Sequence, residues 1–184
     1  MFDSLLKLDG QILLWIQENL RNDFLTPVMK FITRLGDSGI FWIILTVLLL
    51  LYKKTRKTGV LCAMGIIGSA IINNLILKNL VGRIRPYEIV DGLKNIVEKQ
   101  VDASFPSGHT GVSFAVAVIL FRETPKKYGI PALVLAVLIA FSRLYVGVHF
   151  PTDVLGGMIT GTGIALFCCF IYHKNEEWFN QKIK

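Results

Sequence analysis

Five apolar stretches limit what this sequence can fold into. They fall at 40–52, 59–77, 106–121, 128–141 and 154–172. A bilayer span takes roughly 20 mostly apolar residues, and only helices or closed barrels satisfy the backbone in lipid. With 184 residues, 53% of them hydrophobic, the chain is too apolar for an ordinary soluble domain. We therefore predict an all-α polytopic membrane bundle of about five transmembrane helices, forming a single domain over 1–184.

The first 36 residues follow a different pattern. Over 3–20 the apolar residues gather near one helical face, which is typical of an amphipathic helix. A second short segment, 23–35, contains Lys30 and Arg34 and is therefore a poor independent span. We expect 1–36 to form interfacial helices that cover one mouth of the bundle. The alternative is that part of this region crosses the bilayer.

Positive charge is concentrated in short segments between the spans. The loops 53–57 and 122–127 and the tail 174–184 carry half of the 20 Lys and Arg residues. The positive-inside rule places them in the cytoplasm, and segments 78–106 and 142–153 then share the extracytoplasmic face of the plasma membrane. The net charge of +7 thus reports orientation, and we expect no nucleic-acid partner. The predicted layout is interfacial helices at 1–36, a transmembrane bundle at 37–173 and a cytoplasmic tail at 174–184.

Three clusters of polar residues fall in those two extracytoplasmic segments. They are Lys78 with Arg85-Pro86, then Pro106-Ser107-Gly108-His109, then Ser142-Arg143 with His149 and Asp153. Ionisable groups are costly at membrane depth, so they are functional candidates. Each cluster alone has a structural explanation, such as a snorkelling lysine, a helix start or a structural His/Asp pair. Such explanations do not account for all three on one side, in the order that a phosphotransfer site needs.

The cations and the helix start in these clusters match a phosphoryl group. The cations are Lys78, Arg85 and Arg143. The planar arginine fork suits several phosphate oxygens, and lysine adds a point charge. A helix beginning near Pro106 would present backbone N–H groups to an anion, with the Ser107 hydroxyl as a further donor and Gly108 allowing close approach.

Two histidines can supply the nucleophile and the acid. Asp153, four residues after His149, can accept the Nδ1–H and leave Nε2 free to attack phosphorus. His109 then acts as general acid on the leaving oxygen, and water cleaves the phosphohistidine. The cations stabilise the charge, so we expect neither metal nor cofactor. None of the three cysteines has metal-site spacing, and Arg83 is interpreted as a solvated or headgroup-facing charge.

The three clusters resemble the signature of the type 2 phosphatidic acid phosphatase family, membrane relatives of vanadium haloperoxidases and bacterial acid phosphatases. That signature is Lys-x6-Arg-Pro, Pro-Ser-Gly-His and Ser-Arg-x5-His-x3-Asp, and 78–153 matches it without a gap. The resemblance implies a helical bundle with His149 as nucleophile, Asp153 as its orienting partner and His109 as acid. The phosphate ligands that the resemblance implies are Lys78, Arg85, Ser107, Gly108 and Arg143. Many members have six spans, so six is the alternative count, with the first expected to be missing here.

The membrane spans favour a lipid substrate whose headgroup reaches the site at the bilayer surface. The extracytoplasmic site resembles bacterial undecaprenyl pyrophosphate phosphatases, so we expect undecaprenyl diphosphate or a similar isoprenoid diphosphate. Phosphatidylglycerophosphate, phosphatidic acid and lipid A phosphatases share the motif and stay as alternatives, as do a lipid phosphotransferase and a non-enzymatic lipid carrier. The expected partners are this lipid and the surrounding membrane lipids. The charged segment 87–104 is either a lid or rim, or a solvated loop.

Overall fold

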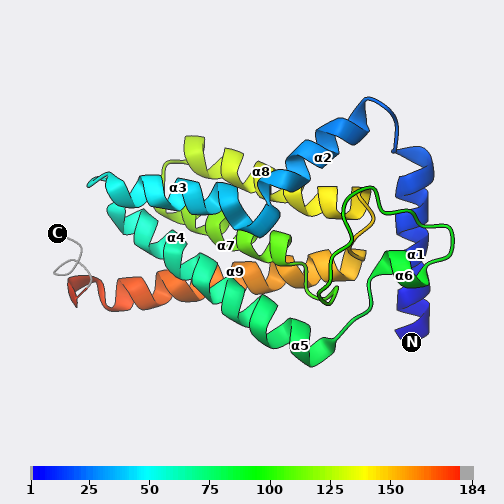
Figure 1. The fold of residues 1–184 in the computed structure, drawn as a ribbon. Helices are drawn as coiled ribbons and strands as arrows, with labels where there is room; N and C mark the ends of the chain where they lie inside the picture. Colours follow the sequence, from blue (N-terminus) through cyan, green and yellow to red (C-terminus); the bar gives the residue numbers. More distant parts are fainter. Residues whose placement is uncertain (1, 179–184) are drawn as a thin grey trace.

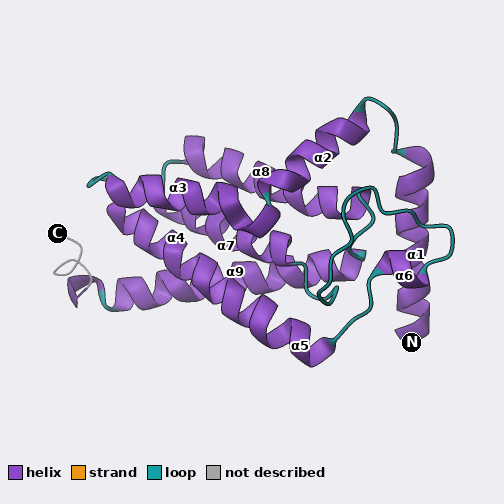
Figure 2. Cartoon of the chain, viewed as in Figure 1, coloured by secondary structure: helices purple, strands orange, loops and turns teal. Residues whose placement is uncertain are grey.

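The computed structural model describes residues 2–178, and within that range every regular element is a helix (Figure 2). The elements are α1 (Phe2–Asn19), α2 (Leu25–Leu35), η1 (Asp37–Gly39), α3 (Ile40–Leu51), α4 (Arg56–Ser69), η2 (Ala70–Leu77), α5 (Lys78–Val81), α6 (Pro86–Ile89), α7 (Gly108–Glu123), α8 (Lys126–Tyr145) and α9 (Pro151–Lys174). The prediction of an all-α bundle is confirmed. The part of the predicted tail beyond residue 178 lies outside the described residues.

Helix α7 is the centre of the bundle, and α4, α8 and α9 pack around it (Figure 1). It is apolar on nearly all sides, which is typical of a helix buried within other helices. Its contact with α9 depends on glycine, because a Cβ on Gly161 would lie 2.3 Å from the carbonyl oxygen of Gly111. Small residues thus let the two backbones approach closely, as membrane helices commonly do.

The outer surface of the bundle is apolar. Large side chains that remain exposed on it include Leu48, Leu75, Ile159 and Phe167, and an apolar exterior of this extent fits a lipid environment. Three stretches are long and apolar enough to cross a membrane, namely Arg56–Ile89, Lys126–Tyr145 and Pro151–Lys174. The number of possible spans rises to four if the bent pair Leu25–Leu35 and Asp37–Leu51 forms one span. Since α7 has only 16 residues, the count of five spans stays a prediction.

Two helices extend beyond their apolar stretches beside the site. Helix α8 continues to Tyr145, beyond the predicted end at 141, and α9 begins at Pro151, before the apolar stretch that starts at 154. Both differences bring polar residues into helices. Ser142 and Arg143 are buried and find partners inside the protein, so their polarity does not end the helix.

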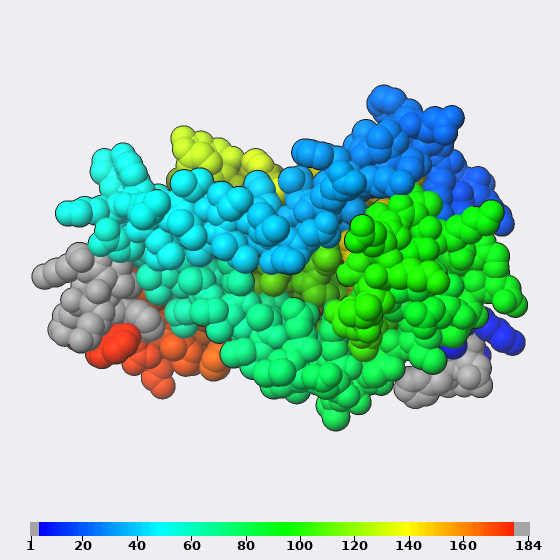
Figure 3. Space-filling model, viewed as in Figure 1, coloured from blue at the N-terminus to red at the C-terminus, as the bar shows by residue number. Residues whose placement is uncertain are grey.

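The two ends of the bundle are unlike. Figure 1 shows the α3–α4 turn and the end of α9 together at one end, and α1 lying crosswise over the other. The long segment between α6 and α7 covers that second end beside α1, and forms its surface in Figure 3. Helix α1 is docked there through Leu13 and Ile16, both buried. The placement of 1–36 at the membrane interface stays a prediction.

Candidate active site

Three cations predicted to bind phosphate converge at the α1 end of the bundle. Lys78 begins α5, Arg85 directly precedes α6, and Arg143 lies in the last turn of α8; all three are buried. They line one cavity of about 350 Å³ together with Gly108 and His149. The structure therefore brings together residues from all three sequence clusters.

His149 lies in the short connection 146–150 between α8 and α9 and is buried. Its Nε2 atom is 3.5 Å from Nη1 of Arg85. Because a guanidinium can only donate, Nε2 acts as an acceptor there and the ring proton belongs on Nδ1. Burial, together with the charges of Arg143 and Arg85, lowers the pKa of His149 to about 3, although Asp153 opposes the change. The imidazole is thus neutral, with Nε2 facing the cations.

Asp153 is oriented by other partners than the predicted one. Its Oδ2 atom is 3.6 Å from Nδ1 of His149, and that Nδ1 has no hydrogen bond within the described part of the chain. Oδ2 instead accepts bonds from the Ser104 hydroxyl (2.5 Å) and from the backbone N–H of Phe150 (2.8 Å). The predicted His149–Asp153 pair is therefore adjacent but not hydrogen-bonded in this structure.

Arg83 holds the other carboxylate oxygen of Asp153, so its interpretation as a solvated charge is wrong. Nη1 lies 2.7 Å from Asp153 Oδ1, Nη2 lies 2.9 Å from Asp9 Oδ2, and only 20% of the side chain is exposed. Thr152 donates to Asp9 as well. The sequence did not indicate these contacts, because the nearer of the two carboxylates lies 70 residues away. The only local signal was that Arg83 falls within the first cluster.

Ser107 and Gly108, both predicted to bind phosphate at the start of α7, have different surroundings in the structure. Ser107 is the N-cap, and its hydroxyl accepts from Thr110 Oγ1 at 2.9 Å. Its backbone N–H donates to the carbonyl of Asp153 at 3.0 Å, so it is already used. Gly108 does line the cavity, and a Cβ there would lie 2.7 Å from Asn74 Oδ1. Ser107 as a direct phosphate ligand stays a prediction, and in this structure it joins α7 to α9.

His109, the predicted acid, lines the same cavity and has a carboxylate partner that the sequence did not reveal. Its Nε2 atom is 2.8 Å from Asp37 Oδ1, in η1. The sequence of 36–39, Gly-Asp-Ser-Gly, is typical of a turn, so it gave no indication that Asp37 contacts a histidine. Gly36 leaves room for the ring, because a Cβ there would lie 2.7 Å from Cδ2 of His109. Asp37 is thus placed to orient the imidazole.

Asp102 supplies an anion where the phosphate is expected. Its carboxylate accepts from Lys78 and, at 2.6 Å, from Nη2 of Arg85, while its carbonyl accepts from Arg85 Nε at 2.9 Å. Although burial opposes it, these bonds and charges lower the pKa of Asp102 to about 2. The side chain is 49% exposed. The two cations had no obvious partner nearby in sequence, and their partner comes from the segment predicted to be a lid, a rim or a solvated loop.

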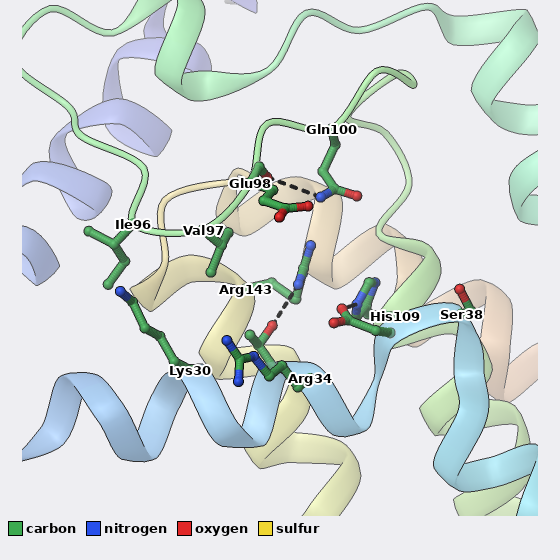
Figure 4. A pocket seen from close by; sticks show the side chains of 11 residues that line it. Lys30, Arg34, Ser38, Ile96, Val97, Glu98, Gln100, His109 and Arg143 are labelled. Atoms are coloured by element: carbon green, nitrogen blue, oxygen red, sulfur yellow. Dashed lines mark hydrogen bonds and ion pairs between the residues drawn. The ribbon is translucent and has the colours of Figure 1, made fainter.

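A second, larger cavity of about 730 Å³ adjoins the first (Figure 4). Lys30 and Arg34 project from α2 on one side of it, and the segment with Glu98 and Gln100 lies opposite. Arg143 lies between them, with Nη1 donating to Thr33 Oγ1 at 2.6 Å. His109 and Arg143 line both cavities.

The chain is similar to known proteins in sequence. The model of the PAP2 superfamily matches residues 58–177. An undecaprenyl-diphosphatase of Sulfolobus acidocaldarius is 36% identical over 141 residues, which are 77% of this chain and 68% of the relative. Phosphatidylglycerophosphatase B of Bacillus subtilis is 34% identical over 178 residues, 90% of this chain and 80% of the relative.

The fold has solved counterparts. The crystal structure of a transmembrane PAP2 type phosphatidylglycerolphosphate phosphatase from Bacillus subtilis superposes with a TM-score of 0.74 at 30% identity, covering 98% of this chain and 88% of that one. The matched part of the chain contains the three cations that line the smaller cavity, together with His109, His149 and Asp153. By sequence and by fold, the chain belongs to the PAP2 superfamily.

Proposed function

We propose that this protein is a metal-independent phosphatase of lipid phosphates or diphosphates that works through a phosphohistidine on His149. The observation that carries the proposal is the single cavity in which Nε2 of His149 faces buried Arg85, with Lys78 and Arg143 on its walls. In this structure Asp102 pairs with Lys78 and Arg85, and a substrate anion with several oxygens could take its place and bind Arg143 as well.

In the first step Nε2 of His149 attacks phosphorus while the bond to the leaving oxygen breaks. His109 gives that oxygen a proton, so the lipid leaves with its oxygen protonated. Charge on the remaining phosphoryl oxygens is stabilised by the three cations and by the first-turn N–H groups of α7. Asp153 keeps a negative charge near the Nδ1 side, which stabilises the ring as it becomes positive.

In the second step water attacks the phosphohistidine. His109, now unprotonated, takes a proton from that water, and the bond between Nε2 and phosphorus breaks. The products are inorganic phosphate and a regenerated neutral His149. All charge stabilisation comes from protein groups, which is why we expect turnover in a chelator.

We propose an isoprenoid diphosphate such as undecaprenyl diphosphate as the substrate. Support comes from the relative named undecaprenyl-diphosphatase, which is 36% identical. The relative named phosphatidylglycerophosphatase B supports the alternative that a phosphatidylglycerophosphate or a phosphatidic acid is hydrolysed, and lipid A is a further alternative of the same chemistry. A lipid phosphotransferase would share the first step and differ only in the acceptor.

The site is proposed to face the extracytoplasmic side of the plasma membrane. The basic loops 53–57 and 122–127 lie at the end of the bundle opposite α1 (Figure 1). The cavity is lined by Lys78 at the start of α5, Gly108 at the start of α7 and Arg143 in the last turn of α8. The positive-inside rule then orients the cavity outward.

The test uses purified full-length protein in detergent with EDTA and a panel of prenyl diphosphates, phosphatidylglycerophosphate, phosphatidic acid and lipid A. We expect phosphate release, and His149→Ala should abolish it. Asp91→Asn, an exposed change outside the cavity, serves as the control and should leave release unchanged. Product analysis with labelled substrate separates hydrolysis from transfer to a second lipid. Absence of release from every lipid, or unchanged turnover in His149→Ala, would refute the proposal.

A further inference from the structure

The two adjoining cavities could each hold an anion, and they differ in their lining residues. The smaller contains Lys78, Arg85 and the Nε2 face of His149, while Lys30 and Arg34 line the larger. Resting on the proposed function, we propose that the larger cavity is a second phosphate subsite, which binds the lipid-linked phosphate of a diphosphate while His149 attacks the terminal one.

The first support is the pair of cations on α2. Lys30 and Arg34 are four residues apart, so they lie on one face of the helix, and both reach the cavity (Figure 4). Neither forms an ion pair with any described residue. Two cations directed into one cavity without carboxylate partners are available to an anionic ligand.

The second support is Arg143, which lies between the two cavities. Its side chain is only 2% exposed, and its Nε atom is buried without a partner in residues 2–178. One Nη donates to Thr33 at 2.6 Å, which directs the guanidinium toward α2. A buried donor left unpaired is costly, and oxygens shared between two phosphates would satisfy it.

The third support is the direction of the reaction. In an in-line displacement the leaving oxygen lies opposite the attacking Nε2 of His149. His109, the proposed acid, lines both cavities. An oxygen protonated by His109 therefore lies at the junction, and the rest of the leaving group extends into the larger cavity.

The charge of that cavity favours a leaving group that is itself a phosphate. Lys30, Arg34 and Arg143 face it, against Asp37 and Glu98. Asp37 is already held by His109. A monophosphate lipid would leave as a neutral alcohol and give the α2 cations nothing to bind, whereas a diphosphate leaves as an anionic lipid monophosphate. In that reaction the bond between the terminal phosphorus and the bridging oxygen breaks, His109 protonates that oxygen, and water later releases inorganic phosphate from His149.

The experiment compares two substrates with the same tail, farnesyl diphosphate and farnesyl monophosphate, in the full-length protein. We expect Lys30→Gln combined with Arg34→Gln to lower kcat/KM for the diphosphate about 100-fold, since two charge-assisted contacts are lost. Hydrolysis of the monophosphate should change by less than about threefold, because its phosphate lies at Lys78 and Arg85. Lys30→Arg with Arg34→Lys should retain most of the diphosphate activity.

A matched control changes the same net charge at the other end of the bundle. Lys53→Gln with Lys54→Gln should leave kcat/KM for both farnesyl substrates unchanged. Equal losses for the two farnesyl substrates in the α2 variant, or no loss for the diphosphate, would overturn the subsite.

A binding measurement separates this inference from the proposed function. Calorimetry with methylenediphosphonate and with inorganic phosphate needs no turnover. We expect the wild type to bind the diphosphonate more tightly than phosphate and the α2 variant to bind the two equally. If the wild type hydrolyses no lipid, the proposed function fails, and the diphosphonate preference still decides the subsite. An undiminished preference in the variant would refute it.

Discussion

The two sides of His149 are built differently. On the Nδ1 side, Asp153 is fully buried, and its oxygens are held by Ser104, Arg83 and a backbone N–H. On the Nε2 side, the buried cations face a cavity. The half-exposed Asp102 pairs with two of them, Lys78 and Arg85. One side is a closed network of protein groups, and the other keeps cationic donors for a ligand. The comparison indicates that the carboxylate behind the imidazole is fixed in place, while the anion in front of it can be exchanged.

The largest effect should come from the closed side. Asp153→Asn keeps the shape of the side chain and removes the negative charge behind His149, so the positive ring of the proposed phosphohistidine loses its stabilisation. We expect kcat to fall about 10³–10⁴-fold with little change in KM. Steady-state kinetics on a lipid diphosphate measures both, with the exposed Glu88→Gln as control. A higher KM at unchanged kcat would place Asp153 in substrate binding.

On the open side, Arg143→Lys should lower kcat/KM about 100-fold, because an ammonium cannot present the two-pronged donor face of a guanidinium. The same assay measures it, and Arg122→Lys, an exposed arginine at the far end of α7, is the matched control. Normal turnover in Arg143→Lys would show that the guanidinium fork is unnecessary.

Arg83→Met tests the closed side through stability. It leaves the carboxylates of Asp9 and Asp153 close together without their shared cation, which should destabilise the fold by about 2–3 kcal/mol. Thermal unfolding in detergent gives the change, with Lys53→Met as control. Adding Asp9→Asn should recover part of the loss, since the repulsion is removed. Additive losses in the double variant would show that Arg83 does not couple the two carboxylates.

The smallest effect, and one of opposite sign, is expected for Asp102→Asn. Removing this carboxylate frees Lys78 and Arg85, so inorganic phosphate should inhibit about tenfold more strongly. Inhibition constants for the variant and the wild type measure it. Weaker inhibition in the variant would mean that Asp102 positions the cations for the phosphate and does not compete with it.

The same residue gives a pH prediction. The pKa of Asp102 is lowered to about 2, below the usual value of about 3.9. The bridge therefore stabilises the fold above that usual value and is lost as the pH falls through about 2. From about pH 5 to about pH 8 the Asp102→Asn and wild-type inhibition constants should keep the same ratio. A ratio that changes within this range would show that Asp102 titrates there.

The sequence predicted which residues come together in the candidate site better than it predicted the partners of those residues. Lys78, Arg85 and His149 could be found because their spacing beside apolar spans is unusual. Asp37 and Asp102 could not, because a carboxylate in a polar loop has the same local pattern whether it is solvated or paired. Arg83 failed for the same reason, since its partners lie on α1 and α9, far away in sequence. Charge pairing across a fold depends on which loops meet, and hydrophobic periodicity does not report that.

The helical architecture could be predicted from the sequence for a simpler reason. A lipid-exposed backbone leaves few alternatives to the helix, so long apolar stretches were sufficient. Helix ends were less accessible. The end of α8 came later than predicted because Ser142 and Arg143 face inward, and the polarity of a residue does not tell inward from outward.

The contact between Asp9 on α1 and Thr152 on α9 has a consequence for biosynthesis. These residues are 143 positions apart, so almost the whole chain must leave the ribosome before they can meet. Contacts of such long sequence separation form late in folding. The carboxylate network behind His149 is therefore completed only after the final helix has been inserted, and a nascent chain lacks it even when all three cations of the cavity have been made.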